Sequence, residues 1–346
     1  MWITLRNVAA GTLAVLLLAL PCRAADTAQQ TFASPEDAVS ALVQALHAGN
    51  VAALAHVLGL GSEKLLESGD AVADANGRQH FLEMYDAGHK LTQAGADRMV
   101  LDVGEDNWPM PIPIVRDGDH WRFDSQQGAQ EIVDRRIGRN EIATIRTLLA
   151  LVDAQRAFKT ENGHYAQRVI SAEGQHDGLY WPTEADATES PLGPLLDEAA
   201  DEGYPGQLVE GKPYPYHGYY YRLLKAQGRA APDGAADYVK DGKLAGGFAF
   251  IAWPAVFGSS GIMTFVVNQE GVVFQKDLGP ATASRAAATT LFDPDLSWAR
   301  IDISDQYRLR SHRLPGTRLG IASPAACFTI GARRWLSQRS APWLRG

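Results

Sequence analysis

Three short apolar segments between Gly246 and Gly279 constrain the fold more than any other part of this chain. They are rich in Val, Ile and Phe, and they are separated by Gly-Ser-Ser-Gly at 258–261 and Asn-Gln-Glu-Gly at 268–271. Short apolar runs bounded by turn residues are typical of successive antiparallel strands. We therefore expect residues 246–279 to form a sheet on which the rest of the chain packs.

The segment Glu131–Glu161 carries the longest helical pattern. Apolar residues recur at intervals of three and four, with charged residues between them: Ile132, Val133, Ile137, Ile142, Ile145, Leu148, Leu149, Val152 and Phe158. Gly138 is a candidate break, and Asn162-Gly163 is a typical helix end. We predict that this helix lies on the sheet, and that residues 214–224 enter the sheet as its first strand.

The length of 346 residues predicts two folded units rather than one. Before the long helix, helical patterns begin after Ser34, and one of them takes in Phe81, Tyr85 and Leu91. A strand at 97–103 and a hairpin around Asp117-Gly118-Asp119 follow. The fold class predicted is α+β. It comprises a small α+β domain over 26–127 and a domain of long helix plus antiparallel sheet over 128–302.

Both ends of the chain differ from the folded part. Arg6 and the apolar run from Val8 to Leu20, followed by small residues, are typical of a secretory signal peptide over residues 1–25, cleaved after residue 24 or 25. The alternative is an uncleaved membrane anchor, although the run is short for one. Residues 303–346 have no periodicity and hold eight Arg against one acid, so we expect a basic, disordered tail. A basic arm that touches anionic lipid or polymer is the alternative.

Charge and cysteine content exclude some functions. The net charge is −8 while the tail carries +7, so the remaining residues carry −15, which argues against nucleic acid as a partner. After signal removal Cys327 is the one cysteine left, so neither a disulfide framework nor a thiolate zinc site is expected. We expect a periplasmic or secreted protein without an integral membrane segment in its mature chain.

No established catalytic motif occurs, which favours a protein that is not an enzyme. Ser259 and Ser260 lie in a strand connection and not in a strand-to-helix elbow, so we interpret them as a turn. His176, Asp177 and His217 are the candidate catalytic residues, because a His beside an Asp can act as a base with its orienting group. The alternative is a structural His and an ordinary Asp-Gly turn. The His spacing predicts no metal site.

Residues 164–221 are rich in aromatic side chains and form a long loop region of the kind that often carries function. Such rings can line a groove for a glycan or peptide. The candidate ligand-binding residues are Tyr165, Tyr180, Trp181, Tyr216, Tyr219 and Arg222. The alternative, which we prefer, is that neighbouring tyrosines of one strand alternate between core and solvent.

Several uncommon strings in this chain occur together in a known family. They are Arg139-Asn140-Glu141, Asp153-Ala154-Gln155, 176–182 (HDGLYWP), 190–194 (SPLGP), 216–220 (YHGYY), 246–254, 261–265 and 276–279. With these strings, residues 35–298 resemble the exported bacterial family of domain of unknown function 2950. The resemblance implies export and the extent of the folded part, and it implies no activity.

A second likeness is at the level of fold. A helix over 142–158, then Asn162-Gly163 and Tyr165, a variable region and an antiparallel sheet resemble the soluble domain of type II secretion pseudopilins. The chain lacks their apolar N-terminal half-helix, so the resemblance implies the fold and not a pilus role. Some of those domains bind calcium, and Asp186, Glu189, Asp197 and Glu198 could supply oxygen ligands. A solvated acidic loop is the other interpretation, and no cofactor is expected.

Two functional hypotheses follow. The first is a non-catalytic binding or assembly module of the cell envelope, with an envelope protein, glycan or peptide as its partner. The second is a hydrolase or transferase that acts on an envelope glycan or peptide through His176, Asp177 or His217.

Overall fold

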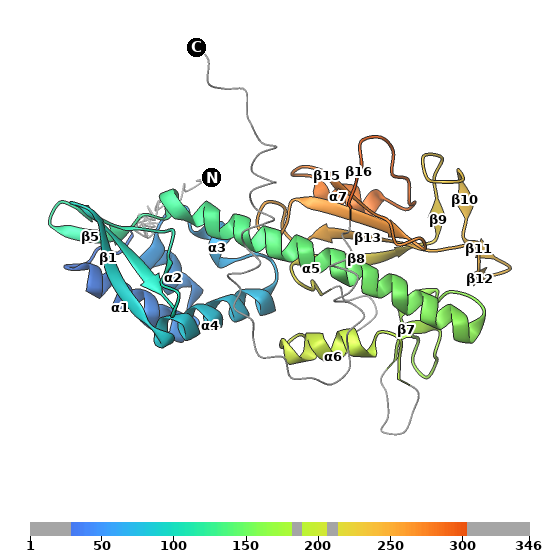
Figure 1. Ribbon diagram of the computed structural model, residues 1–346, viewed down its shortest axis with the longest axis horizontal. Helices are drawn as coiled ribbons and strands as arrows, with labels where there is room; N and C mark the ends of the chain where they lie inside the picture. Colours follow the sequence, from blue (N-terminus) through green and yellow to red (C-terminus); the bar gives the residue numbers. More distant parts are fainter. Residues whose placement is uncertain (1–28, 182–188, 206–213, 303–346) are drawn as a thin grey trace, which may run out of the picture.

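The computed structural model describes residues 29–181, 189–205 and 214–302 (Figure 1). Helices and antiparallel sheets are combined, so the predicted α+β class is confirmed. Buried hydrophobic residues form two clusters. We call the one built from residues up to Ile132 the N-terminal cluster, and the one built from residues from Ile145 onward the C-terminal cluster. The predicted signal peptide, the calcium candidate Asp186 and the predicted tail at 303–346 lie outside the described residues.

The N-terminal cluster lies between helices and a five-stranded antiparallel sheet. The sheet has the order β1-β2-β4-β5, with β3 also paired to β2. The elements are α1 (Pro35–His47), α2 (Val51–Leu58), α3 (Glu63–Leu66), α4 (Ala71–Ala87), β1 (His89–Gly95), β2 (Arg98–Val103), β3 (Trp108–Pro109), β4 (Ile114–Asp117) and β5 (His120–Phe123). The strand at 97–103 and the hairpin are confirmed. The prediction that the helix extends to Leu91 was wrong, because α4 ends at Ala87 and Leu91 belongs to β1.

Side chains placed before these helices fix where they begin. The Ser34 hydroxyl accepts a hydrogen bond from the Asp37 N–H at 3.1 Å, and Pro35 occupies the first turn of α1. In the same way, Asn50 accepts from the Ala53 N–H and Asp70 accepts from the Ala73 N–H. Each cap satisfies an N–H group that the helix itself leaves unpaired.

The long helix is continuous. α5 (Ser125–Asn162) has 38 residues, passes through Gly138 without a break, and ends at Gly163, whose φ of 74° is the left-handed conformation of a helix C-cap. Its first turns contribute Ala129 and Ile132 to the N-terminal cluster, and its later turns contribute Leu148, Leu151 and others to the C-terminal cluster. The predicted domain boundary at 127/128 therefore falls inside the first turn of α5.

The three predicted strands are confirmed as β13 (Ala249–Pro254), β14 (Met263–Asn268) and β15 (Val273–Asp277). With β8 (Tyr219–Leu224) and β16 (Ala299–Arg300) they form an antiparallel sheet of order β16-β15-β14-β13-β8. The predicted first strand thus pairs with β13, at one edge of the sheet. The Ser259-Ser260 segment is a turn, in which both N–H groups donate to the Val256 carbonyl.

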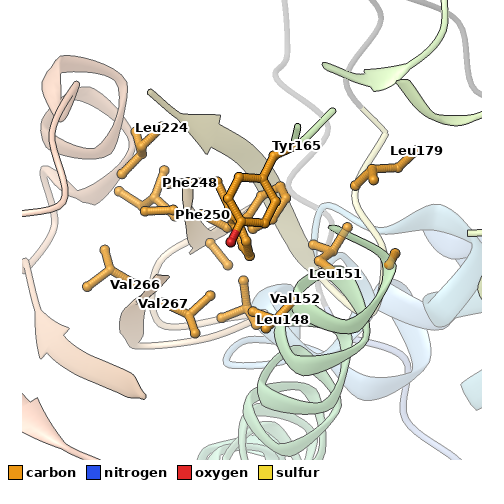
Figure 2. Close-up of a cluster of buried hydrophobic side chains, with 14 of the residues drawn as sticks. Leu148, Leu151, Val152, Tyr165, Leu179, Leu224, Phe248, Phe250, Val266 and Val267 are labelled. Atoms are coloured by element: carbon orange, nitrogen blue, oxygen red, sulfur yellow. The ribbon is translucent and has the colours of Figure 1, made fainter. Parts of the chain in front are cut away.

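Helices cover both faces of this sheet. Phe250 and Val267 are paired across β13 and β14, so they share a face, and Figure 2 shows them with Leu148 and Val152 of α5. Arg222, on the other face, donates to the Ala286 and Ala287 carbonyls of α7 (Thr282–Ala288). Residues 249–252 are fully buried for this reason, and they form one unbroken apolar run.

Shorter elements complete this half of the chain. One short helix is α6 (Gly193–Asp201), and one short ribbon is parallel, β6 (Arg168–Ile170) with β7 (Gly178–Tyr180). Two further ribbons are antiparallel: β9 (Ala226–Gln227) with β10 (Ala236–Asp237), and β11 (Val239–Lys240) with β12 (Lys243–Leu244). Within the part of the chain that the structure describes, no helix combines the length and apolarity needed to cross a bilayer.

Candidate functional site

His176 and Asp177, two candidate catalytic residues, make separate contacts. The His176 ring is exposed and stacks on Trp181, with ring centroids 4.4 Å apart. The Asp177 carboxylate accepts a hydrogen bond from the Ala172 N–H at 2.9 Å and pairs with Arg168 at 3.3 Å. Asp177 therefore holds the loop before β7 through its contacts with Ala172 and Arg168.

The candidate ligand-binding residues divide into core residues and connectors. Tyr165, Tyr180, Trp181 and Tyr219 are all buried in the C-terminal cluster. The Tyr219 hydroxyl donates to the Met263 carbonyl at 3.0 Å, and Arg222 binds the carbonyls at the end of α7. The four aromatic residues are thus part of the core, and Arg222 caps the end of α7. Tyr216 is half-buried and lies beside His217.

His217 lies in a tight turn that brings chemically versatile groups together. The Tyr216 and Tyr219 main chains hydrogen-bond to each other, and His217 and Gly218 between them have φ of 49° and 75°. Two consecutive positive φ values are those of a type I′ turn, in which Gly is favoured. His217 Nε2 lies 3.4 Å from Glu202 Oε2, and the two side chains are 27% and 34% exposed.

The Asp70 carboxylate connects this turn to the other half of the chain. One oxygen caps α4, and the other accepts from the Tyr204 hydroxyl at 2.9 Å and from the Gly218 N–H at 2.8 Å. The Tyr204 hydroxyl in turn accepts from the His217 N–H at 3.2 Å. We call Asp70, Glu202, Tyr204, Tyr216 and His217 the polar joint, because it ties the start of α4 to the segments after α6 and before β8.

Arg136 of α5 makes a second connection close by. Its guanidinium donates to the carbonyls of Lys64, of Leu65 at 3.0 Å and of Ser259 at 3.1 Å, and it lies 3.6 Å from Asp74. The Ser259 hydroxyl also donates to the Lys64 carbonyl at 3.0 Å. The turn at 258–261 is thus bound directly to the end of α3.

Burial favours the uncharged forms of four side chains of the polar joint, those of Glu202, His217, Tyr204 and Tyr216. Burial raises the pKa of Glu202 to about 7, with smaller contributions from the carboxylates of Glu198 and Asp70. Burial lowers the pKa of His217, opposed by Asp70 and reinforced by Arg146. Burial likewise raises the pKa values of Tyr204 and Tyr216. Near neutral pH a protonated Glu202 can therefore face a neutral imidazole, as donor and acceptor.

Such a pair can take up or release one proton near neutral pH, which is a requirement of general acid–base catalysis. Both side chains are partly exposed, so water has access to them. Among the described residues, no group of three or more His, Cys, Asp or Glu has the arrangement of a metal site. Of the calcium candidates, Glu189, Asp197 and Glu198 are described, and Asp186 lies outside the described residues.

Sequence reasoning identified His217 and Tyr216 but missed the residues that surround them. Asp70, Glu202 and Tyr204 lie in stretches with no motif, and Asp70 is 134 residues from Tyr204. The one available signal was the position of Asp70 before a helix, which predicts a cap but not a contact with the distant half of the chain.

A comparison with known families gives one match. The model of a family described as Protein of unknown function (DUF2950) matches residues 29–301. No curated protein and no solved structure matches this sequence.

Proposed function

Because the chain belongs to the DUF2950 family, which carries no assigned activity, we propose a function on the basis of its own residues. The proposed function is that of a non-catalytic binding or assembly module of the cell envelope. The observation that carries this proposal is the use of its reactive side chains. The Asp70 carboxylate, the Ser259 hydroxyl and the Arg136 guanidinium all bind main-chain groups of distant segments. Groups used in this way stabilise an arrangement of two clusters, which is what a binding scaffold requires.

We infer that the chain works outside the cytoplasm. The apolar run from Val8 to Leu20 after Arg6 has the pattern of a signal peptide, and the family match begins after it, at residue 29. Mass spectrometry of the protein from a periplasmic fraction should give a chain that begins at residue 25 or 26. A protein that keeps residues 1–24 and stays in the cytosol would contradict export.

The binding role is tested with the mature protein and isolated envelope material. We expect peptidoglycan or envelope protein to retain the chain in a sedimentation assay, while mass spectrometry of the soluble fraction finds no new products. New products that disappear with His217→Ala protein would overturn the proposal, as would the absence of any retention.

The polar joint supports a second candidate, a hydrolase or transferase that uses the proton shared by Glu202 and His217. The raised pKa of Glu202 and its 3.4 Å approach to His217 favour this pair over His176 and Asp177. A catalytic pair predicts that Glu202→Gln and His217→Asn each abolish turnover, while His176→Ala does not. Equal activity of all three variants would exclude the joint as a catalytic centre.

A further inference from the structure

A hollow of about 340 Å³ lies on the sheet of order β16-β15-β14-β13-β8, on the face that α7 covers. Its volume is within the range of small-molecule sites. Val266 of β14 and Leu278 line it together with Leu291, which is 41% exposed. Lys276, Asp293 and Trp298 line the same hollow and give it charged and aromatic groups.

The Lys276 ammonium is held in place by its neighbours. It donates to the Ser297 hydroxyl at 2.6 Å and lies 5.8 Å from the centre of the Trp298 ring. Ser297 is fixed in turn by Asp295, which accepts hydrogen bonds from the Ser297 N–H and hydroxyl. An ammonium has three N–H donors, so Lys276 keeps hydrogen-bonding capacity for a ligand.

Asp293 supplies the opposite charge. One carboxylate oxygen accepts from the Ala230 N–H at 2.7 Å, and the other makes no hydrogen bond within the described ranges. Among the described residues, Lys276 and Asp293 form no ion pair with each other, although both line the hollow. Two opposite charges that share a hollow without pairing complement a ligand with two oppositely charged ends.

A buried hydroxyl lies on β14, the strand next to Lys276 in the sheet. Thr264 is the cross-strand partner of Lys276, is fully buried, and has an Oγ1 without a hydrogen-bond partner among the described residues. Buried hydroxyls are normally paired, so an unpaired one directly across from Lys276 is unusual.

We propose that this hollow binds a small zwitterion, namely an apolar α-amino acid or a short peptide with free ends. The ligand's carboxylate binds Lys276, its ammonium binds Asp293, and its apolar side chain lies on Val266, Leu278 and Leu291. This inference rests on the proposed binding role and names the ligand class for it. A simple anion would make no use of the second Asp293 oxygen, and an apolar molecule would make no use of either charge.

Isothermal titration calorimetry at neutral pH with the dipeptide alanyl-leucine tests this site. We expect saturable binding that weakens by about tenfold or more in Lys276→Met and in Asp293→Asn, since each change removes a hydrogen bond between charged groups. The neutral analogue, with an acetylated amine and an amidated carboxylate, should bind at least about tenfold more weakly for the same reason. Lys225→Met is the matched control, because Lys225 is exposed and lines a neighbouring hollow instead.

Thermal melts of each variant establish that it is folded. Binding that Lys276→Met leaves unchanged would place the dipeptide elsewhere and overturn the inference. Retention on peptidoglycan together with no dipeptide binding would also overturn it, while leaving the proposed function intact. New products lost with His217→Ala would instead overturn the proposed function, whether or not the dipeptide binds.

Discussion

At the scale of single residues, Arg136 and Asp70 each make several of the polar contacts between the two halves of the chain. Arg136 bonds to carbonyls at Lys64, Leu65 and Ser259, so its guanidinium replaces water for three main-chain acceptors. Its side chain is 13% exposed, and that of its ion-pair partner Asp74 is 10% exposed. Removing the cation would leave the nearly buried Asp74 carboxylate without its ion-pair partner and would take one hydrogen bond from each of the three carbonyls.

We therefore expect Arg136→Ala to lower the free energy of unfolding by about 3 kcal/mol. Arg78→Ala is the control, because Arg78 belongs to α4 and makes no hydrogen bond or ion pair within the described residues, so its loss should cost less than about 0.5 kcal/mol. Urea unfolding followed by circular dichroism measures both. Equal losses in the two variants would mean that the Arg136 contacts contribute little in solution.

Glu202→Gln tests the titration in the polar joint. The folded pKa of about 7 lies above the ordinary value of 4.5, so the folded protein binds this proton more tightly than the unfolded chain. That stabilisation is complete below pH 4.5 and is lost as the pH rises through about 7. The amide of the variant does not titrate. After a discount for a side chain that is about one-third exposed, the wild type should lose about 1 kcal/mol relative to the variant between pH 4.5 and about pH 8.

The comparison with the variant separates the contribution of Glu202 to the pH dependence of stability from the contributions of its neighbours. The lowered pKa of His217 acts in the opposite direction, since its stabilisation is present above pH 6.5 and is lost as the pH falls through the folded pKa. Glu198, Asp70 and Arg146 also face the pair, and all are the same in both proteins. Urea unfolding at the two pH values gives the result, and parallel pH dependence of the two proteins would contradict it.

At the scale of elements, α5 contains two glycines with opposite surroundings. A Cβ added at Gly128 would lie 2.2 Å from the Pro111 carbonyl oxygen, whereas one added at Gly138 would have nothing within 4 Å. The first glycine allows the start of α5 to approach the main chain before β4. The second serves no packing purpose in the described structure.

Gly128→Ala should therefore lower the free energy of unfolding by about 2 kcal/mol, because backbone must move to admit the methyl group. Gly138→Ala should raise it by about 0.5–1 kcal/mol, since alanine is the better helix former. Thermal and urea unfolding of the two variants provide the test. A stabilised Gly128→Ala protein would show that the contact with Pro111 is looser than the structure has it.

The elements that sequence reasoning found are those whose burial follows from local pattern. β13 to β15 are apolar runs between turn residues, and α5 keeps its periodicity for most of its length, so both were predictable. β1 was missed because it is mostly exposed and lacks alternation, so Leu91 was assigned to the preceding helix. The polar joint was beyond reach for a different reason. Its members are held by contacts between segments that are far apart in the sequence, and no local sequence pattern predicts such contacts.

At the scale of the whole molecule, one helix is shared by both hydrophobic clusters. α5 contributes Ala129 to the first and Leu148 to the second, with the exposed Arg139 between them. The division into domains at 26–127 and 128–302 stays a prediction, because two clusters joined by one rigid element can unfold together or separately.

Arg139→Pro distinguishes these cases. Proline at this exposed position breaks α5 between the two clusters at a cost of about 3 kcal/mol, without removing a core side chain. If α5 couples the clusters, calorimetry should give one thermal transition for the wild type and for the control Arg139→Ala, and two for the proline variant. A single transition in all three proteins would mean that the polar joint and the Arg136 contacts couple the clusters even when α5 is not continuous.

The position of Arg136 also bears on the order in which the molecule is assembled during synthesis. Its partners Lys64, Leu65 and Asp74 leave the ribosome before it, while Ser259 follows more than a hundred residues later. The guanidinium can therefore dock onto the first helices as soon as α5 forms, with part of its hydrogen-bonding capacity still open. The turn at 258–261 then binds to a site on α3 and α5 that has already formed, and the strands that follow the turn are added to the sheet after it.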